Sequence, residues 1–125
     1  GTHGIECDPF ESDVLWLTTL KHQTLTKLYA VDWQVLHTLP LPYERAHGVV
    51  RVPDGIWVVH TGNRVIVKLD TENGEEKERI VVPPEWPEPH GLSIWGAPKD
   101  NEYRYRTFVY CDATSGWIVK IELGE

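Results

Sequence analysis

The fold is decided by residues 46–69, which read AHGVVRVPDGIWVVHTGNRVIVKL. The stretch contains three short apolar runs, and turn-forming residues separate them at Pro53-Asp54-Gly55 and Gly62-Asn63-Arg64. Runs rich in Val and Ile that are bounded by such turns are typical of β-strands. The stretch therefore predicts three antiparallel strands joined by tight turns.

The same pattern recurs on both sides of this stretch. The dipeptide His-Gly begins at His3, His47 and His90, at intervals of 44 and 43 residues. Each dipeptide is followed by a first and a second apolar run, and then by a third run that carries a lysine between apolar residues (Lys27, Lys68 and Lys120). In the first two repeats a fourth run closes the unit. A period in the low forties with four strands per unit predicts the blades of a β-propeller.

Composition agrees with an all-β chain. The 125 residues include 14 Val, 7 Ile and 10 Thr but only 4 Ala, and β-branched side chains favour strands over helices. Nine Pro and ten Gly divide the chain into short segments. We expect strands at Ile5–Cys7, Val14–Leu20, Thr24–Val31, Val35–Leu39, Val49–Val52, Ile56–His60, Val65–Leu69, Lys77–Val82, Leu92–Trp95, Thr107–Asp112 and Trp117–Leu123.

The chain is expected to form one domain of three blades, at about residues 3–42, 47–83 and 90–125. Three four-stranded blades do not close a ring, and an open stack leaves two apolar sheet faces uncovered. Either the chain belongs to a longer one, or a second copy completes a six-bladed ring as a homodimer. We favour the homodimer, in which the third blade of one copy lies beside the first blade of the other.

Charge and hydropathy exclude two classes of partner. The formal net charge is −7 and no cluster of Lys and Arg is present, so we expect no nucleic-acid partner. No apolar run approaches the roughly 20 residues that span a bilayer, which predicts a soluble protein with no membrane partner. The two cysteines, Cys7 and Cys111, are too few for a disulfide framework. They form at most one bridge, for which a contact between two copies is the candidate place; the favoured alternative is two buried free thiols. Free thiols suit a reducing compartment, so a cytoplasmic location is favoured.

The middle repeat resembles a blade of the NHL, SMP-30 and streptogramin-lyase group of six- and seven-bladed propellers. The residues that carry the resemblance are His47-Gly48, the turn Pro53-Asp54-Gly55, the strand around Trp57 and the turn Asn63-Arg64. The likeness is close only in this repeat, since Leu20–Gln23 replaces the Gly-Asn-Arg turn in the first. These motifs specify the type of blade well and the activity poorly.

In a propeller the first strand of each blade lines the central channel, so His3, His47 and His90 are expected to converge there. Imidazole is the commonest protein ligand for Zn, Fe, Cu and Ni, and an adjacent Gly allows the backbone to crowd a narrow channel. The prediction is a divalent transition-metal site, similar to the His-bound metals of amidating lyases and related propellers. The alternative is that these histidines are part of the blade pattern and bond to the backbone of the neighbouring blade.

The turns between second and third strands are expected to open on the same face. His60 and Asp112 hold the same position in their blades, and either is a candidate general base beside a metal-bound water. Arg45, Tyr43 and Trp86 are candidates for binding a small polar substrate. Each has a simpler interpretation as a solvated turn residue or as packing against the next blade. Most of the six Trp residues are expected to lie between blades.

Two functions follow from these patterns. The first is a metal-dependent lyase or hydrolase that acts on a small polar molecule. The alternative is a non-catalytic propeller that serves as a binding scaffold with structural histidines on its axis, because a fold alone does not decide function.

Overall fold

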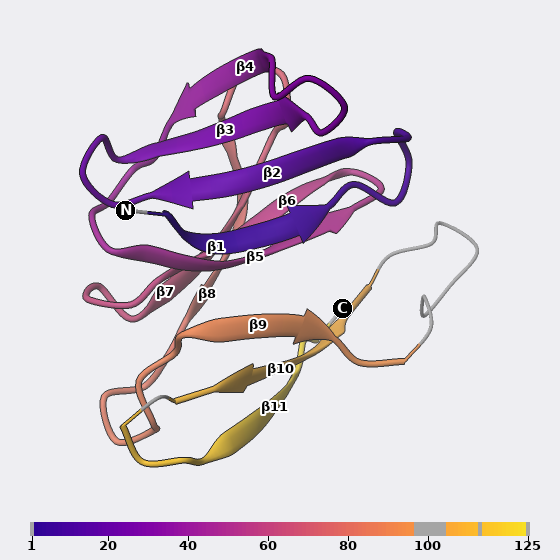
Figure 1. The fold of residues 1–125 in the computed structure, drawn as a ribbon. Coiled ribbons are helices and arrows are strands. Elements are labelled where there is room, and N and C mark those ends of the chain that lie inside the picture. The colour runs from indigo at the N-terminus through magenta and orange to yellow at the C-terminus, as the bar shows by residue number, and fades with distance from the viewer. Residues whose placement is uncertain (1, 97–104, 113, 125) are drawn as a thin grey trace.

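The computed structural model describes residues 2–96, 105–112 and 114–124, and these contain only β-strands as regular elements (Figure 1). The prediction of an all-β chain is confirmed. The strands form three antiparallel sheets, which we call blades 1, 2 and 3. Blade 1 consists of β1 (Thr2–Cys7), β2 (Val14–Thr19), β3 (Thr24–Tyr29) and β4 (Val35–Pro40); blade 2 of β5 (Ala46–Val52), β6 (Gly55–His60), β7 (Val65–Leu69) and β8 (Glu76–Val81); blade 3 of β9 (Gly91–Ile94), β10 (Thr107–Cys111) and β11 (Ile118–Glu122).

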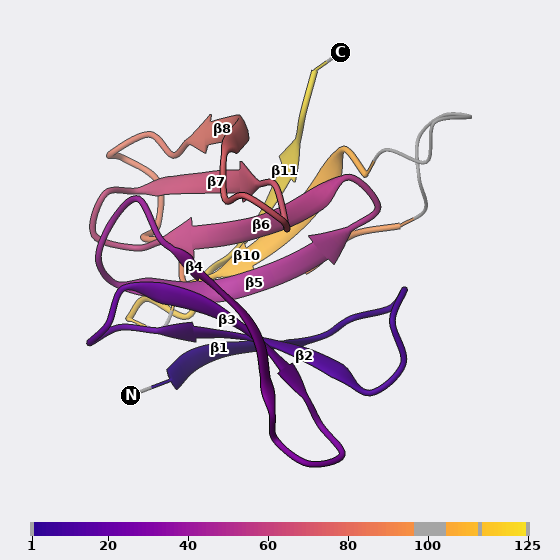
Figure 2. The same ribbon diagram turned by 90° about the horizontal axis from the view of Figure 1, so that it is seen from above.

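The blades are stacked face to face, with their first strands β1, β5 and β9 adjacent to one another (Figure 1). Seen from above in Figure 2, β5 lies between β1 and the outer strands β7 and β8 of its own sheet. One apolar cluster, which includes Trp16 and Val58, fills the space between blades 1 and 2. A second, which includes Trp57 and Phe108, fills the space between blades 2 and 3. Because side chains alternate along a strand, β6 contributes Ile56 and Val58 to one cluster and its odd-numbered neighbours to the other.

The lysine that marks the third strand of every repeat has the same contact in all three blades. Lys27, Lys68 and Lys120 each place Nζ over the ring of a tryptophan, at 5.6, 5.5 and 5.4 Å from the centroid. In blades 1 and 2 that tryptophan is the direct cross-strand neighbour, Trp16 or Trp57, whereas in blade 3 it is Trp95. The repeat seen in the sequence is therefore a repeat of side-chain contacts as well.

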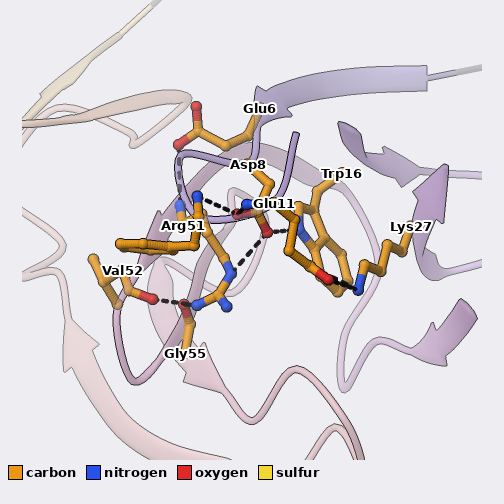
Figure 3. A network of polar contacts seen from close by, with 9 residues as sticks. Glu6, Asp8, Glu11, Trp16, Lys27, Arg51, Val52 and Gly55 are labelled. Atoms are coloured by element: carbon orange, nitrogen blue, oxygen red, sulfur yellow. Dashed lines mark hydrogen bonds and ion pairs between the residues drawn. The ribbon is translucent and has the colours of Figure 1, made fainter. Parts of the chain in front are cut away.

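A buried polar network joins blades 1 and 2 at the ends of their first strands (Figure 3). The side chain of Asp8 is 0% exposed, and its Oδ2 accepts hydrogen bonds from Trp16 Nε1 at 2.9 Å and from Arg51 Nε at 3.1 Å. The backbone N–H of Arg51 donates to Glu6 Oε2 at 3.0 Å, and its guanidinium lies 5.0 Å from the Phe10 ring. The network fixes the two sheets relative to each other.

Most tryptophans and both cysteines are more exposed than expected. Only Trp16 and Trp57 are buried, whereas Trp33, Trp86, Trp95 and Trp117 are 41–66% exposed, so most of the Trp residues do not lie between blades. Cys7 and Cys111 are both free and exposed. Among the described residues, none belongs to a helix with the length and apolar character that crossing a bilayer demands.

Candidate functional site

Three histidines gather where the first strands begin. The rings of His3 and His47 have their centroids 5.0 Å apart, and those of His47 and His90 are 4.5 Å apart. His3 and His47 lie at irregularities of strand pairing, between Thr2 and Gly4 in β1 and between Ala46 and Val49 in β5. An extra residue at such a bulge redirects a side chain, and bulges are frequent beside functional sites. We call His3, His47 and His90 the histidine cluster.

The glycine after each histidine allows the blades to meet this closely. A Cβ on Gly4 would lie 1.8 Å from the carbonyl oxygen of His47, and a Cβ on Gly48 would lie 2.7 Å from that of His90. The Gly48 N–H donates a hydrogen bond to this same His90 oxygen at 2.9 Å. The His-Gly dipeptide is thus required by backbone contact between neighbouring blades, and that contact holds the imidazoles together.

His47 is held in one tautomer. Its Nδ1 lies 2.9 Å from the backbone oxygen of Arg45 and 2.7 Å from Thr61 Oγ1, whose own proton is donated to the Pro89 carbonyl at 2.8 Å. Since a carbonyl oxygen can only accept, Nδ1 carries the hydrogen and Nε2 keeps its lone pair in the neutral ring. Arg45 adopts a left-handed backbone conformation with φ 53°, uncommon for a residue with a side chain.

The charge state of His47 follows from its surroundings. Burial lowers the pKa of His47 below its ordinary value, the hydrogen bond to Arg45 opposes this, and the neighbouring His90, His3 and Arg45 lower it further. The ring is therefore neutral near pH 7, which is the form that ligates metals.

A carboxylate lies beside the cluster on the connection between blades 2 and 3. Glu88 Oε1 is 3.4 Å from His90 Nε2 and 3.7 Å from Arg45 Nη2. The Glu88 N–H donates to Asp112 Oδ2 at 3.2 Å. Glu88 thus joins the third imidazole to the cation that precedes His47.

Three imidazoles are ligands of the kind that a divalent transition metal prefers, but the three rings are not oriented around a common point. Two imidazoles that share an ion at a Zn–N distance of about 2.0–2.1 Å have ring centres on the order of 5 Å apart, close to the spacing found here. Among the described residues, however, no group of three or more His, Cys, Asp and Glu side chains has the arrangement of a metal site. Binding an ion would require the rings to turn about their side-chain bonds.

His60 lies behind this face, buried between blades 1 and 2. It is 0% exposed, and neither ring nitrogen has a hydrogen-bond partner of ordinary geometry among the described residues. Burial lowers the pKa of His60 to about 4, with the Glu44 backbone opposing and Arg79 adding to the shift. Its ring packs edge-on against Tyr43 at 5.3 Å, and Tyr43 in turn accepts a hydrogen bond from Arg79 at 3.0 Å. His60 is thus fully buried against a half-buried Tyr43.

Asp112 shapes a turn and borders a groove. Its carboxylate accepts from the Thr114 N–H at 2.7 Å and from Ser115 Oγ at 3.0 Å, in addition to the Glu88 N–H. The Thr114 hydrogen bond is the main cause that lowers the pKa of Asp112, against burial, so it is ionised at neutral pH. The groove, about 470 Å³, is lined by Glu85, Trp86, Pro87, Asp112, Ser115, Trp117 and Val119.

The expected site residues therefore fall into three places. His3, His47, His90 and Arg45 meet at the cluster, and Asp112 and Trp86 share the adjoining groove. The buried His60 packs behind them against the half-buried Tyr43. Strand register gives His60 and Asp112 equivalent positions, because Val59 and Cys111 pair with Ile66 and Ile118. Sequence reasoning missed Thr61 and Glu88, since their roles depend on contacts between blades and neither belongs to a repeated motif.

Neither a scan against protein-family models nor a search of curated proteins gave a match. Solved structures with a β-propeller fold do match, so the chain is β-propeller-like, as the resemblance in the sequence predicted.

Three of these structures illustrate the likeness. Hydrazine synthase of Kuenenia stuttgartiensis matches with a TM-score of 0.69 and 16% identity over 98% of this chain and 32% of its own. The propeller domain of Cps50 (Swd1) from Myceliophteria thermophila gives 0.63 and 10% over 98% and 37%. A catalytically inactive histidine-to-alanine variant of virginiamycin B lyase from Staphylococcus aureus, solved with quinupristin, gives 0.57 and 18% over 99% and 42%. The chain thus spans about a third of the length of the structures it matches, and at these identities the likeness concerns the fold alone.

Proposed function

We propose that the histidine cluster binds a divalent transition metal (Zn, Fe, Cu or Ni) and that the chain serves a metal-dependent lyase or hydrolase of a small polar substrate. The observation that carries the proposal is the meeting of three imidazoles, from three blades, within 5.0 and 4.5 Å of one another. The neutral form of His47 and its free Nε2 add support. In virginiamycin B lyase, a similar fold, a histidine-to-alanine variant is catalytically inactive.

The chain's own residues have separate tasks in this proposal. Arg45 and Thr61 hold His47 through Nδ1, as the acceptors behind metal-bound histidines commonly do. Glu88 keeps His90 oriented, and Asp112 fixes Glu88 through its backbone N–H. A bound ion supplies a Lewis acid that polarises a carbonyl or lowers the pKa of water. The exposed Arg45 guanidinium and the groove at Trp86 then offer contacts for a polar, anionic substrate group.

His60 is not assigned to the chemistry. A ring that is 0% exposed and has a pKa of about 4 cannot reach a substrate in the cluster without a change in the packing of blades 1 and 2. Asp112 is assigned a positioning task, because its oxygens already accept three hydrogen bonds and its lowered pKa makes it a weak base.

A second candidate function is a non-catalytic binding scaffold. It is favoured by the hydrogen bonds from His47 to Arg45 and Thr61, which serve equally to pin blade 2, and by the lack of a preformed metal arrangement among the described residues. In that case the imidazoles only fill the crowded inner end of the sheets.

Zinc titration separates the two. The chain, stripped of metal, is titrated with Zn²⁺ at pH 7.5 by calorimetry, alongside His47→Ala and His37→Ala. His37 is the matched control, because it lies on β4 and contacts the Glu72 carbonyl at 2.7 Å, away from the cluster. We expect His37→Ala to bind as the unmodified chain does, and His47→Ala to bind at least about tenfold more weakly. Equal affinity and stoichiometry for both variants would reject the metal site and leave the scaffold.

A further inference from the structure

We infer that a second copy of this chain covers the two faces of the stack that the described residues leave uncovered, with blade 1 of each copy packed on blade 3 of the other. The inference names the partner of the histidine cluster, and to that extent it rests on the proposed function. Its test measures assembly without metal, so the two ideas fail separately.

The first uncovered face belongs to blade 1. Because Val14, Trp16 and Thr18 of β2 point toward blade 2, their neighbours Leu15 and Leu17 point the other way. Ile5 of β1 pairs with Leu17, shares that face and is 65% exposed. The positions equivalent to Ile5, Leu15 and Leu17 are occupied in blade 2 by Val49, Ile56 and Val58, which are all buried against blade 1.

The second uncovered face belongs to blade 3. Val109, Cys111 and Ile118 point away from blade 2 and border an apolar groove of about 320 Å³. Ile118 is 72% exposed, whereas Ile66, which holds the equivalent position in blade 2, is 0% exposed against blade 3. The uncovered face of blade 3 thus carries apolar side chains at a position that is buried by a neighbouring blade in blade 2.

The two faces match each other in the way that the two built interfaces do. Each built interface presents, from the preceding blade, a tryptophan beneath a lysine: Trp16 with Lys27, and Trp57 with Lys68. Blade 3 presents Trp95 with Lys120 on its uncovered side. In each built interface the following blade packs an aliphatic surface against this tryptophan and lysine. Within the described residues, the aliphatic surface that no blade covers is that of blade 1. The contact is therefore a continuation of the interfaces already present.

The second copy also completes the histidine cluster. Gly4 packs on the backbone oxygen of His47, and Gly48 packs on that of His90. Within the described residues Gly91 has no such oxygen against it, and only the Cys111 side chain would meet a Cβ there, at 2.9 Å. In the inferred contact the carbonyl of His3 from the second copy takes this place and its imidazole lies beside His90. A head-to-tail contact used twice closes a two-fold ring with six histidines around its axis.

The register of this contact separates the two cysteines. Cys111 corresponds to Thr18, whose hydroxyl donates to the His47 carbonyl, so it lies opposite His3 of the second copy. Cys7 corresponds to Arg51 and lies four residues beyond His3 along the first strand, or about 13 Å at roughly 3.3 Å per residue. A disulfide between Cys7 and Cys111 of two copies does not fit, and the dimer is held by packing alone.

Light scattering coupled to size exclusion, in EDTA and a reducing agent, tests the inference. The expected mass is twice the 14.4 kDa of one chain. Ile5→Lys and Ile118→Lys each place a charge on one face, and each is expected to weaken the dimer by tenfold or more. Val31→Lys is the matched control, since Val31 is 66% exposed in the turn between β3 and β4. An equimolar mixture of Ile5→Lys and Ile118→Lys restores one unmodified contact and is expected to recover part of the dimer.

Several results would overturn the inference. A chain of 14.4 kDa at tens of micromolar means that something other than a second copy covers the faces. A dimer that survives Ile5→Lys does not use blade 1, and one that Val31→Lys weakens equally does not use these faces. Circular dichroism of each variant confirms that the sheets are retained. Zinc binding by a monomeric chain would reject the dimer and support the metal site. A dimer that binds no zinc would support the dimer and reject the metal site.

Discussion

The two interfaces between blades both have an apolar core and differ in the polar contacts beside it. Between blades 1 and 2, a carboxylate that is 0% exposed meets a guanidinium and an indole N–H, and a buried histidine lies farther along the same space. Between blades 2 and 3, Trp57 meets Phe108 with centroids 5.4 Å apart among aliphatic side chains, and Arg106 forms an ion pair with a half-buried carboxylate, Glu78. Apolar packing thus holds both interfaces, and a buried carboxylate–guanidinium pair is added between blades 1 and 2.

This difference has a consequence for stability. Apolar packing does not depend on protonation, whereas buried ionisable groups make stability depend on pH. We therefore expect acid to loosen the interface of blades 1 and 2 before that of blades 2 and 3. The polar interface also fixes orientation, because Arg51 must meet Asp8, Glu6 and the Gly55 carbonyl together.

The largest expected effect comes from removing the cation of the polar interface. Arg51→Ala leaves Asp8 buried without its charge partner, which typically costs about 3–5 kcal/mol of unfolding free energy. Urea denaturation at pH 7 measures the loss. Arg79→Ala is the control, because its partner Glu76 is exposed and little change is expected.

The same pair predicts a pH dependence. Burial raises the pKa of Asp8, but hydrogen bonds from Trp16 and Phe10 and the charge of Arg51 together lower it below its ordinary value. The carboxylate therefore stabilises the fold above the pKa of the unfolded chain, about 3.9, and this stabilisation is lost as pH falls below it. The difference between the unmodified chain and Arg51→Ala should shrink in that range; a difference that is constant down to pH 2.5 would count against the role of Asp8.

A second effect, on the order of 3 kcal/mol, is expected from His60. In the unfolded chain it takes up a proton near pH 6.5, but in the folded chain only near pH 4. Between these values the unfolded state binds more protons, so the unfolding free energy falls as pH falls from about 6.5 to about 4. His60→Leu should flatten this slope, whereas the control His22→Leu, at an exposed turn position, should keep it. A slope in His60→Leu equal to that of the unmodified chain would show that His60 is not the buried neutral group described.

The smallest effect tests the feature that both interfaces share. Gly48→Ala places a methyl group 2.7 Å from the His90 oxygen and the Leu92 nitrogen, so the blades must separate slightly, at a cost of roughly 1–3 kcal/mol. Gly62→Ala is the control, because its Cβ would meet Arg45 side-chain atoms at 3.6 Å, an ordinary contact. Thermal unfolding compares the two; equal melting temperatures would mean that the close backbone approach is not needed.

The sequence was sufficient to predict the strands, because each depends on local pattern. Val65–Leu69 is found as expected, and the other ten strands of the described residues begin within three residues of their expected positions. The turn at Pro53-Asp54-Gly55 joins β5 to β6 as expected. The repeated lysine lies in the third strand of every blade and has the same contact in each. Period and alternation suffice for these, since they are set by neighbours along the chain.

The site was only partly predictable. The meeting of His3, His47 and His90 follows from the repeat. The burial of His60 does not, because this residue stands at the boundary between an apolar strand and a polar turn, and the sequence does not show to which of the two it belongs. Glu88 lies in a Pro-rich connection that carries no repeated pattern. Arg51 lies in β5, where a charged side chain is ordinarily expected to face solvent. Arg51 owes its role to Asp8 on blade 1, and Glu88 owes its role to Arg45 and Asp112 as well as to the nearby His90. Contacts of that kind leave no periodic signal.

Histidine resonances test the central claim most directly. In a long-range ¹H–¹⁵N spectrum at pH 7.5, the six histidines of the chain can be followed while Zn²⁺ is added. The metal site predicts that His3, His47 and His90 shift together and saturate at the same ratio of zinc to protein, while His22, His37 and the buried His60 stay in place. Shifts at His22 or His37 that match those of the cluster, or a cluster that does not respond, would contradict it.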